Sequence, residues 1–206
     1  CKNSDLEDRQ GWQLYRRSQK IGADMGLFSM KLFHKSGSKA NKSAESVSEN
    51  YNVIAEQLGL TAECREIIAD PRAYYNAHQD SYDERGIGSG SNIGTVIWIG
   101  IVNEMLLSHK ACEFDYKEEL DDFAAAMEDI MPSSLSTPLE TLDEGDDITA
   151  WAEQLTDAWS DRGYALAAFD IYSDSYVIFV CRREILPTLS AAADKTGHRI
   201  ALAQDM

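Results

Sequence analysis

The sequence has 206 residues, 44% of them hydrophobic and 26% charged, which is the composition of a globular protein with one domain and a sizeable core. Its formal net charge of −16 argues against nucleic-acid binding, because contacts to phosphates require a basic surface. The sequence has no run of about eighteen apolar residues, so it predicts no transmembrane segment. The four cysteines form no CxxC pair, which favours reduced thiols over disulfides or a zinc site, and we expect no cofactor.

The first 42 residues are basic, with nine Lys or Arg against four acids, and we expect a flexible N-terminal segment ahead of one domain at 43–206. The initial Cys1 allows two interpretations. In one, it is the lipid-bearing residue of a mature lipoprotein that is anchored to a membrane. In the other, which we favour, translation starts at Met25, residues 1–24 precede the natural protein, and the protein is cytoplasmic.

Helical signals fill the first half of the expected domain. Hydrophobic spacing predicts helices, in chain order, at 46–58, 61–70, 72–85 and 93–110. Gly59 ends the first of them, and Pro71 breaks the second and opens the third. The fourth follows a loop rich in Gly and Ser and is almost wholly apolar, which indicates a helix buried in the core.

The second half alternates strands with helices. We expect, in chain order, a strand at 111–116, helices at 118–130 and 147–161, strands at 164–171 and 176–181, a helix at 184–195 and a strand at 199–203. The stretch 133–146 shows no periodicity and is a linker loop with a soft internal boundary. The pattern predicts an α+β fold, in which a helical N-terminal half packs with a small, mostly antiparallel sheet of about four strands.

Negative charge is concentrated after the first predicted strand. Between Glu113 and Asp147 the chain has thirteen acids and one base, Lys117. The apolar residues of the helix at 118–130 share one face, so the acids lie on the outer face. A solvated surface, a docking surface for a basic protein and a cation site are all compatible with this pattern. The candidate binding residues here are Asp115, Glu118, Glu119, Asp121 and Asp122.

Carboxylates also follow the predicted strands. Asp115 ends the first strand, Asp170 ends the second, and Asp174 lies in the hairpin turn before Tyr176; Asp170, Asp174 and Tyr176 are further candidate binding residues. Strand ends that meet at one rim of a sheet can form a metal site or an acid–base pair. The alternative is structural: Asp115 caps the next helix, while Asp170 and Asp174 bind turn amides. The four histidines form no HxH or HxxxH pair and no GxSxG motif is present, so we assign no catalytic residue and no metal ligand.

Three stretches carry a resemblance to a known family. They are Tyr82-Asp83-Glu84-Arg85-Gly86-Ile87, then Glu113-Phe114-Asp115-Tyr116-Lys117-Glu118, and finally Gly163-Tyr164-Ala165-Leu166 continuing to Asp170 and Ser173-Asp174-Ser175-Tyr176. Together they resemble DUF6630, an uncharacterised bacterial family, over residues 45–205. The resemblance implies a small cytosolic domain without an assigned activity, and it transfers no catalytic residue. The Gly-Ser stretch after Ile87 departs from the pattern of the family.

Two functions follow from these observations. The leading prediction is a non-enzymatic module whose acidic face binds a basic protein partner, for example an immunity or antitoxin-like inhibitor of a basic toxin. The alternative is a carboxylate-dependent, metal-binding hydrolase, which requires Asp115, Asp170 and Asp174 to lie within reach of one ion. The sequence leaves the oligomeric state open.

Overall fold

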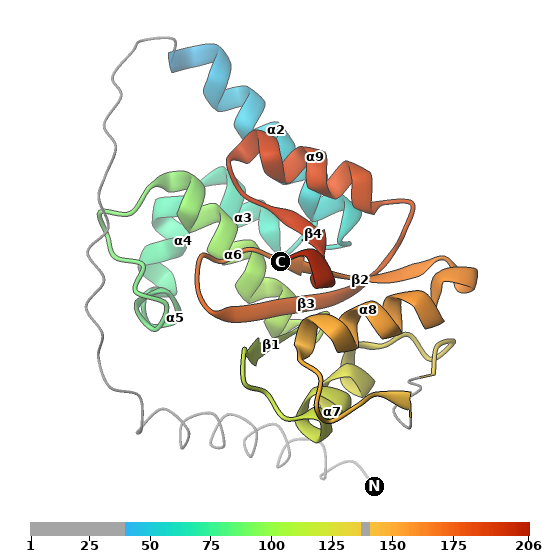
Figure 1. Cartoon of the computed structure of the whole chain (residues 1–206). Helices are drawn as coiled ribbons and strands as arrows, with labels where there is room; N and C mark the ends of the chain where they lie inside the picture. Colours follow the sequence, from blue (N-terminus) through green and yellow to red (C-terminus); the bar gives the residue numbers. More distant parts are fainter. Residues whose placement is uncertain (1–39, 137–140) are drawn as a thin grey trace, which may run out of the picture. The chain divides into compact units, whose positions relative to one another are not determined.

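A four-stranded antiparallel sheet lies at the centre of the domain, with helices on both of its faces (Figure 1). The computed structural model describes residues 40–136 and 141–206, with side chains from residue 47 onward. The strands are β1 (Ala111–Asp115), β2 (Tyr164–Phe169), β3 (Ser175–Arg182) and β4 (Ile200–Leu202). They lie in the order β1-β3-β2-β4. The predicted α+β class and antiparallel sheet are confirmed.

The first layer of helices covers one face of the sheet. It contains α2 (Ala40–Gln57), α3 (Cys64–Ala69), α4 (Pro71–Ala77), α5 (Gln79–Asp83), α6 (Ile93–Leu107) and α9 (Leu186–Thr196). Residues 96–103 of α6 are all buried, as the apolar sequence predicted. Helices α3 and α4 pack on α6, while α2 packs on α9. The ring of Trp98 contacts that of Phe169, which joins α6 to the sheet.

The second layer covers the opposite face and contains α7 (Leu120–Ile130), α8 (Ile148–Ala158) and two short 3-10 helices, η2 (Ser160–Arg162) and η3 (Ala203–Asp205). Phe123 and Trp151 pack here with Leu166 and Ile178 of the sheet. Because helices bury both faces, β2 and β3 consist of almost continuous apolar residues instead of alternating ones.

Two local expectations were wrong. The helix predicted at 72–85 is divided into α4 and α5 at His78, whose backbone N–H turns back to the carbonyls of Tyr74 and Tyr75. Asp115 does not cap α7, because that helix begins only at Leu120. The Asp115 carboxylate instead accepts a hydrogen bond from the backbone N–H of Lys117 and closes the turn after β1.

Residues 1–39 and 137–140 lie outside the described residues. The expectations for Cys1 and for a basic flexible segment at 1–42 therefore stay predictions, as does the soft boundary at 133–146. The described ends of that loop pack on the second layer, with Leu135 and Leu142 buried there. In addition, the indole N–H of Trp159 donates to the carbonyl of Ser136. No helix in the described part of the chain is long and apolar enough to cross a membrane.

Candidate functional site

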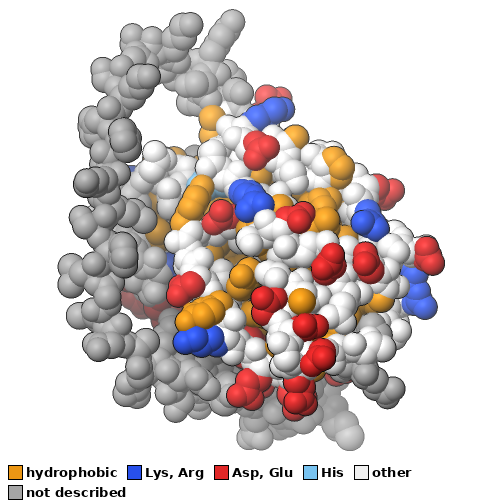
Figure 2. All heavy atoms as spheres, in the orientation of Figure 1, with side chains coloured by type: hydrophobic (Ala, Val, Ile, Leu, Met, Phe, Trp, Pro, Cys, Tyr) orange, Lys and Arg blue, Asp and Glu red, His pale blue; other side chains and the backbone are white. Residues whose placement is uncertain are grey.

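The outer surface of the second layer is acidic. From residue 115 to residue 162, excluding 137–140, the structure has thirteen exposed carboxylates and two exposed bases, Lys117 and Arg162. The carboxylates belong to Asp115, Glu119, Asp121, Asp122, Glu128, Asp129, Asp143, Glu144, Asp146, Asp147, Glu153, Asp157 and Asp161. Figure 2 shows acidic side chains over the part of the surface that α7 and α8 form. We call this surface the acidic layer.

The sequence of α7 explains how its acids reach the surface. Phe123 and Met127 face the sheet and are fully buried, so the charged residues of the helix point outward. Asp121 and Asp122 lie in the first turn, where the helix dipole favours negative charge. Glu128 and Asp129 lie near the C-terminal end of the helix, where the dipole disfavours it, and the last turn contains no basic residue.

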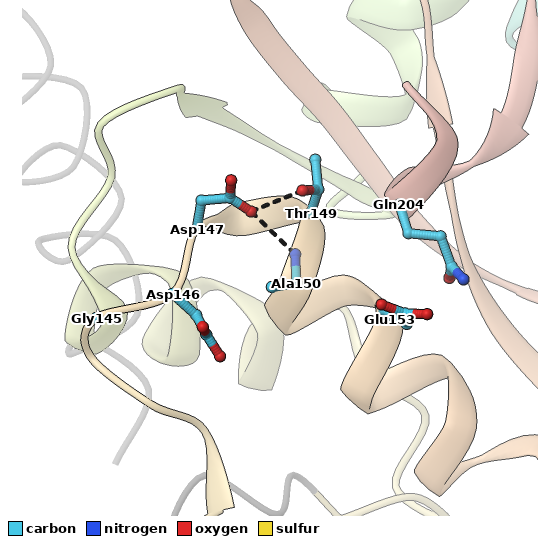
Figure 3. A pocket seen from close by; sticks show the side chains of 7 residues that line it. All are labelled: Gly145, Asp146, Asp147, Thr149, Ala150, Glu153 and Gln204. Carbon is cyan, nitrogen blue, oxygen red and sulfur yellow. Dashed lines mark hydrogen bonds between the residues drawn. The ribbon is translucent and has the colours of Figure 1, made fainter.

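A pocket of about 390 Å³ lies in the acidic layer at the start of α8 (Figure 3). It is lined by Gly145, Asp146, Asp147, Thr149, Ala150, Glu153 and Gln204, and we call it the acidic pocket. Asp147 caps α8 and accepts hydrogen bonds from the Thr149 hydroxyl at 2.6 Å and the Ala150 N–H at 3.0 Å. These bonds lower the pKa of Asp147, so its carboxylate stays ionised. The pocket has the charge to bind a cation.

A second pocket, of about 260 Å³, lies at the rim of the sheet where β2 ends and β3 begins. We call it the rim pocket, and its lining residues are Tyr116, Phe169, Asp170, Ile171, Ser173, Asp174, Ser175, Tyr176, Arg199 and Met206. Three residues predicted from strand ends, Asp170, Asp174 and Tyr176, therefore line one pocket. Asp115 does not line it, although its cross-strand partner Ser175 does.

Hydrogen bonds fix the loop between β2 and β3. The backbone N–H of Asp170 donates to the carbonyl of Arg199, and its own carbonyl accepts from the Trp98 indole at 2.8 Å. The Asp170 carboxylate accepts from the N–H of Tyr172 at 2.8 Å, as the turn chemistry predicted. Tyr172 has a φ of 57° and donates its hydroxyl to the carbonyl of Gly197. The rim pocket is therefore built on a loop that is held from two sides.

The residues behind this loop form a buried aromatic cluster. The ring of His198 stacks on that of Trp98, with centroids 4.5 Å apart and planes at 5°. The centroid of the Tyr51 ring lies 6.4 Å from that of His198. Burial lowers the pKa of His198, although a hydrogen bond with the backbone of Gly94 and the nearby Asp170 oppose that effect. Among the described residues, Nδ1 of His198 has no hydrogen-bond partner. His198 is therefore neutral in the folded protein near neutral pH.

The metal-dependent alternative lacks a ligand set in the described part of the chain. No three His, Cys, Asp or Glu residues at 40–136 and 141–206 are grouped so that they could hold an ion. Asp170 and Asp174 lie in one pocket, but Asp115 does not join them in such a group.

Several residues of these surfaces were found only in the structure. Asp121 and Asp122 are exposed in the first turn of α7, as the helix predicted at 118–130 implied, whereas Glu118, which is half-buried, and Glu119, which is exposed, lie before that helix. Asp146 and Glu153 were not among the candidate residues, because Asp146 lies in the expected linker loop and Glu153 lies beyond the acidic stretch that ends at Asp147. Arg199 and Gln204 join the pockets through tertiary packing, for which the sequence contains no local signal.

These features define the class of protein, an α+β domain with one acidic layer and two small polar pockets. The chain belongs to the family described as a domain of unknown function, DUF6630, whose sequence profile matches residues 46–203. The family suggested by the three sequence stretches is confirmed. No curated protein and no solved structure was found to match the chain.

Proposed function

We propose that the protein is a non-enzymatic interaction module whose acidic layer binds a basic protein. The observation that supports it most is the number of exposed carboxylates on the second layer. In its described residues, the acidic layer presents thirteen exposed carboxylates against two exposed bases, Lys117 and Arg162. Residues 47–110 of the first layer present fewer, eight exposed carboxylates, with Arg65 as an exposed base, while Arg72, Arg85 and Lys110 are half-buried.

The placement of acids on α7 supports a role in binding. Glu128 and Asp129 oppose the dipole of their own helix, and the turn that contains them has no basic residue to offset the cost. Acids in such positions destabilise the helix, so helix stability does not explain why they are there. A surface that attracts a positively charged partner accounts for them.

The charge of this layer has a defined physical effect on association. Opposite charge speeds the encounter of two proteins and orients them, and it weakens with salt because ions screen it over about 10 Å. Affinity then comes from a few anchor side chains that enter pockets. The acidic pocket lies inside the layer and provides Asp146, Asp147 and Glu153 for a cationic anchor. An immunity or antitoxin-like inhibitor of a basic toxin is one concrete form of this function.

The test is capture of the partner from the native host at low and at moderate salt, with mass spectrometry of the bound proteins. We expect a stoichiometric basic protein whose capture falls as salt rises. The triple variant Asp122→Asn/Glu128→Gln/Asp129→Asn removes three charges from the acidic layer and should lose the partner. The matched control Glu56→Gln/Glu63→Gln/Asp194→Asn removes three exposed charges from the first layer and should keep it.

Two results would contradict the proposal. Equal loss of capture in both triple variants would show an effect of net charge without a docking surface. Recovery of the protein alone, at low as well as at moderate salt, would show that it binds no basic protein under those conditions.

A further inference from the structure

The rim pocket has the chemistry of a receptor for a single cationic side chain. We propose that it binds the guanidinium group of an arginine of the basic partner, as a second anchor beside the acidic pocket. The identity of the partner rests on the proposed function, whereas the chemistry of the pocket does not.

The charges of the rim pocket favour a cation. Its lining contains two carboxylates, Asp170 and Asp174, against one guanidinium, that of Arg199. Nη2 of Arg199 donates to the backbone carbonyl of Asp205 at 2.5 Å, so part of that group is already used within the chain. One oxygen of Asp170 accepts the N–H of Tyr172, and the other accepts no hydrogen bond from the described residues. An excess of acceptors and of one negative charge remains for a ligand.

The walls of the rim pocket are aromatic, which selects guanidinium over a simple ammonium ion. Tyr116, Phe169 and Tyr176 line it; Tyr116 is 49% exposed, whereas Phe169 is buried. Nζ of Lys117 lies 4.8 Å from the centroid of the Tyr116 ring, so this ring already receives one cation of the chain. A planar guanidinium stacks on such rings while it donates to carboxylates, a combination that a compact ammonium provides less well. The same chain contains this arrangement elsewhere, since the guanidinium carbon of Arg182 lies 4.1 Å from the ring centroid of Tyr164.

The size and rigidity of the rim pocket suit one side chain. Its volume of about 260 Å³ is below the range of roughly 300–1,000 Å³ that is typical of sites for drug-sized molecules. The loop that forms it is fixed by the bonds of Asp170 to Trp98 and Arg199, so little ordering is required when a ligand binds.

The two pockets are placed for one partner. The short helix η3 and the residue that follows it contribute to both, because Gln204 lines the acidic pocket and Met206 lines the rim pocket. The rim pocket also contains Tyr116, which lies directly beside Asp115 of the acidic layer. A basic surface that covers the acidic layer can therefore supply an anchor to each pocket.

The first test uses a probe whose only charge is the side chain, Nα-acetyl-arginine amide, with the neutral isostere Nα-acetyl-citrulline amide as its control. We expect amide shifts in residues 170–176 and a shift of the Trp98 indole N–H in ¹⁵N NMR spectra with the arginine probe alone. Equal shifts with both probes, or none with either, would overturn the proposal.

Two substitutions separate a cation site from an anion or zwitterion site. Asp174→Asn should weaken binding of the arginine probe about three- to fivefold, the effect of one exposed charge pair. Arg199→Gln should strengthen it, because the repelling charge is gone. Asp194→Asn, with the same change of charge on α9 in the first layer, should leave it unchanged. Loss of binding in Arg199→Gln would show that Arg199 is a ligand for an anion and that the assignment is wrong.

Capture of the basic partner, compared with binding of the arginine probe, distinguishes a failure of this inference from a failure of the proposed function. If Asp174→Asn captures the basic partner as well as the wild type does, while the triple variant of the acidic layer does not, the inference fails and the proposed function stands. If the arginine probe binds but no basic protein is captured, the proposed function fails and the chemistry of the rim pocket stands.

Discussion

The guanidinium of Arg85 forms a two-point ion pair with the carboxylate of Glu113, with Nη1–Oε1 at 3.2 Å and Nη2–Oε2 at 2.7 Å. Nε of Arg85 donates to the amide oxygen of Asn103 at 3.0 Å. Arg85 follows α5, Asn103 belongs to α6 and Glu113 belongs to β1. One side chain therefore connects two helical segments of the first layer to the edge of the sheet.

Removing one member of this pair should destabilise the protein. The exposed fractions of the Arg85 and Glu113 side chains are 18% and 21%, so Glu113→Ala leaves a mostly buried positive charge without its partner. We expect a loss of about 2 kcal/mol in the free energy of unfolding, measured with urea. The double variant Arg85→Met/Glu113→Leu should recover most of it. Equal losses in the single and double variants would show that packing, and not the unpaired charge, is responsible.

Gly100 in α6 should not tolerate alanine. A Cβ there would lie 2.8 Å from Cγ2 of Ile67 and 2.8 Å from the hydroxyl of Tyr82, which donates to the carbonyl of Val96. Alanine gains about 1 kcal/mol in helix propensity, but overpacking costs more, so we expect a net loss of roughly 1–2 kcal/mol by urea unfolding. Gly88→Ala, where a Cβ meets nothing within 4 Å, is the control and should change stability little. A stabilised Gly100→Ala would contradict the close packing of α3 and α5 on α6.

Stability should fall as the pH drops below about 6.5, in part because of His198. Burial lowers its pKa from the ordinary value of 6.5, so the unfolded chain takes up a proton in this range before the folded protein does. The contribution of neutral His198 to stability is complete above the pKa that it has in the unfolded chain. It is lost as the pH falls toward the lower pKa of the folded protein. The ionisable groups that face His198 are Tyr51, Asp170 and Tyr172.

The check is the free energy of unfolding at about pH 7.5 and about pH 5.5 for the wild type and for His198→Phe, which keeps a ring against Trp98. The variant should lose less stability between the two values than the wild type does. Equal losses would assign the pH dependence to other groups.

Two substitutions of Asp147 should distinguish its role as the cap of α8 from the effect of its charge in the acidic pocket. Asp147→Ala removes the acceptor for Thr149 and Ala150 and should cost about 1 kcal/mol. Asp147→Asn keeps an acceptor oxygen and should be nearly neutral in urea unfolding, yet both variants remove the charge. If the acidic pocket receives a cation, both should weaken capture of the basic partner. Weakened capture in the alanine variant alone would mean that the cap, and not the charge, matters.

The elements of the fold were largely predictable because each has a local signal. The apolar run of α6, the glycine after α9 and the two strands of the β2–β3 hairpin all stand at or near their predicted positions. The break at His78 was not predictable, since it depends on Tyr74, Tyr75 and Tyr82 all being buried against the first layer. Local periodicity contains no information on that packing.

The candidate site divides in the same way. Acids on the outer face of α7 follow from helical spacing alone, and the gathering of Asp170 and Asp174 follows from the hairpin. Arg85 pairs with Glu113, which is 28 positions away in the sequence. Arg199 lines the rim pocket together with Asp170, which is 29 positions away. Such contacts depend on how the layers pack, and a single sequence does not report that.

The contribution of residues 203–206 to both pockets has a practical consequence for the design of binding experiments. Met206 lines the rim pocket, and Nη2 of Arg199 is bonded to the carbonyl of Asp205. A substitution that shifts this segment changes both pockets at once. Binding at each pocket is therefore separated with substitutions outside the segment, at Glu153 for the acidic pocket and at Asp174 for the rim pocket.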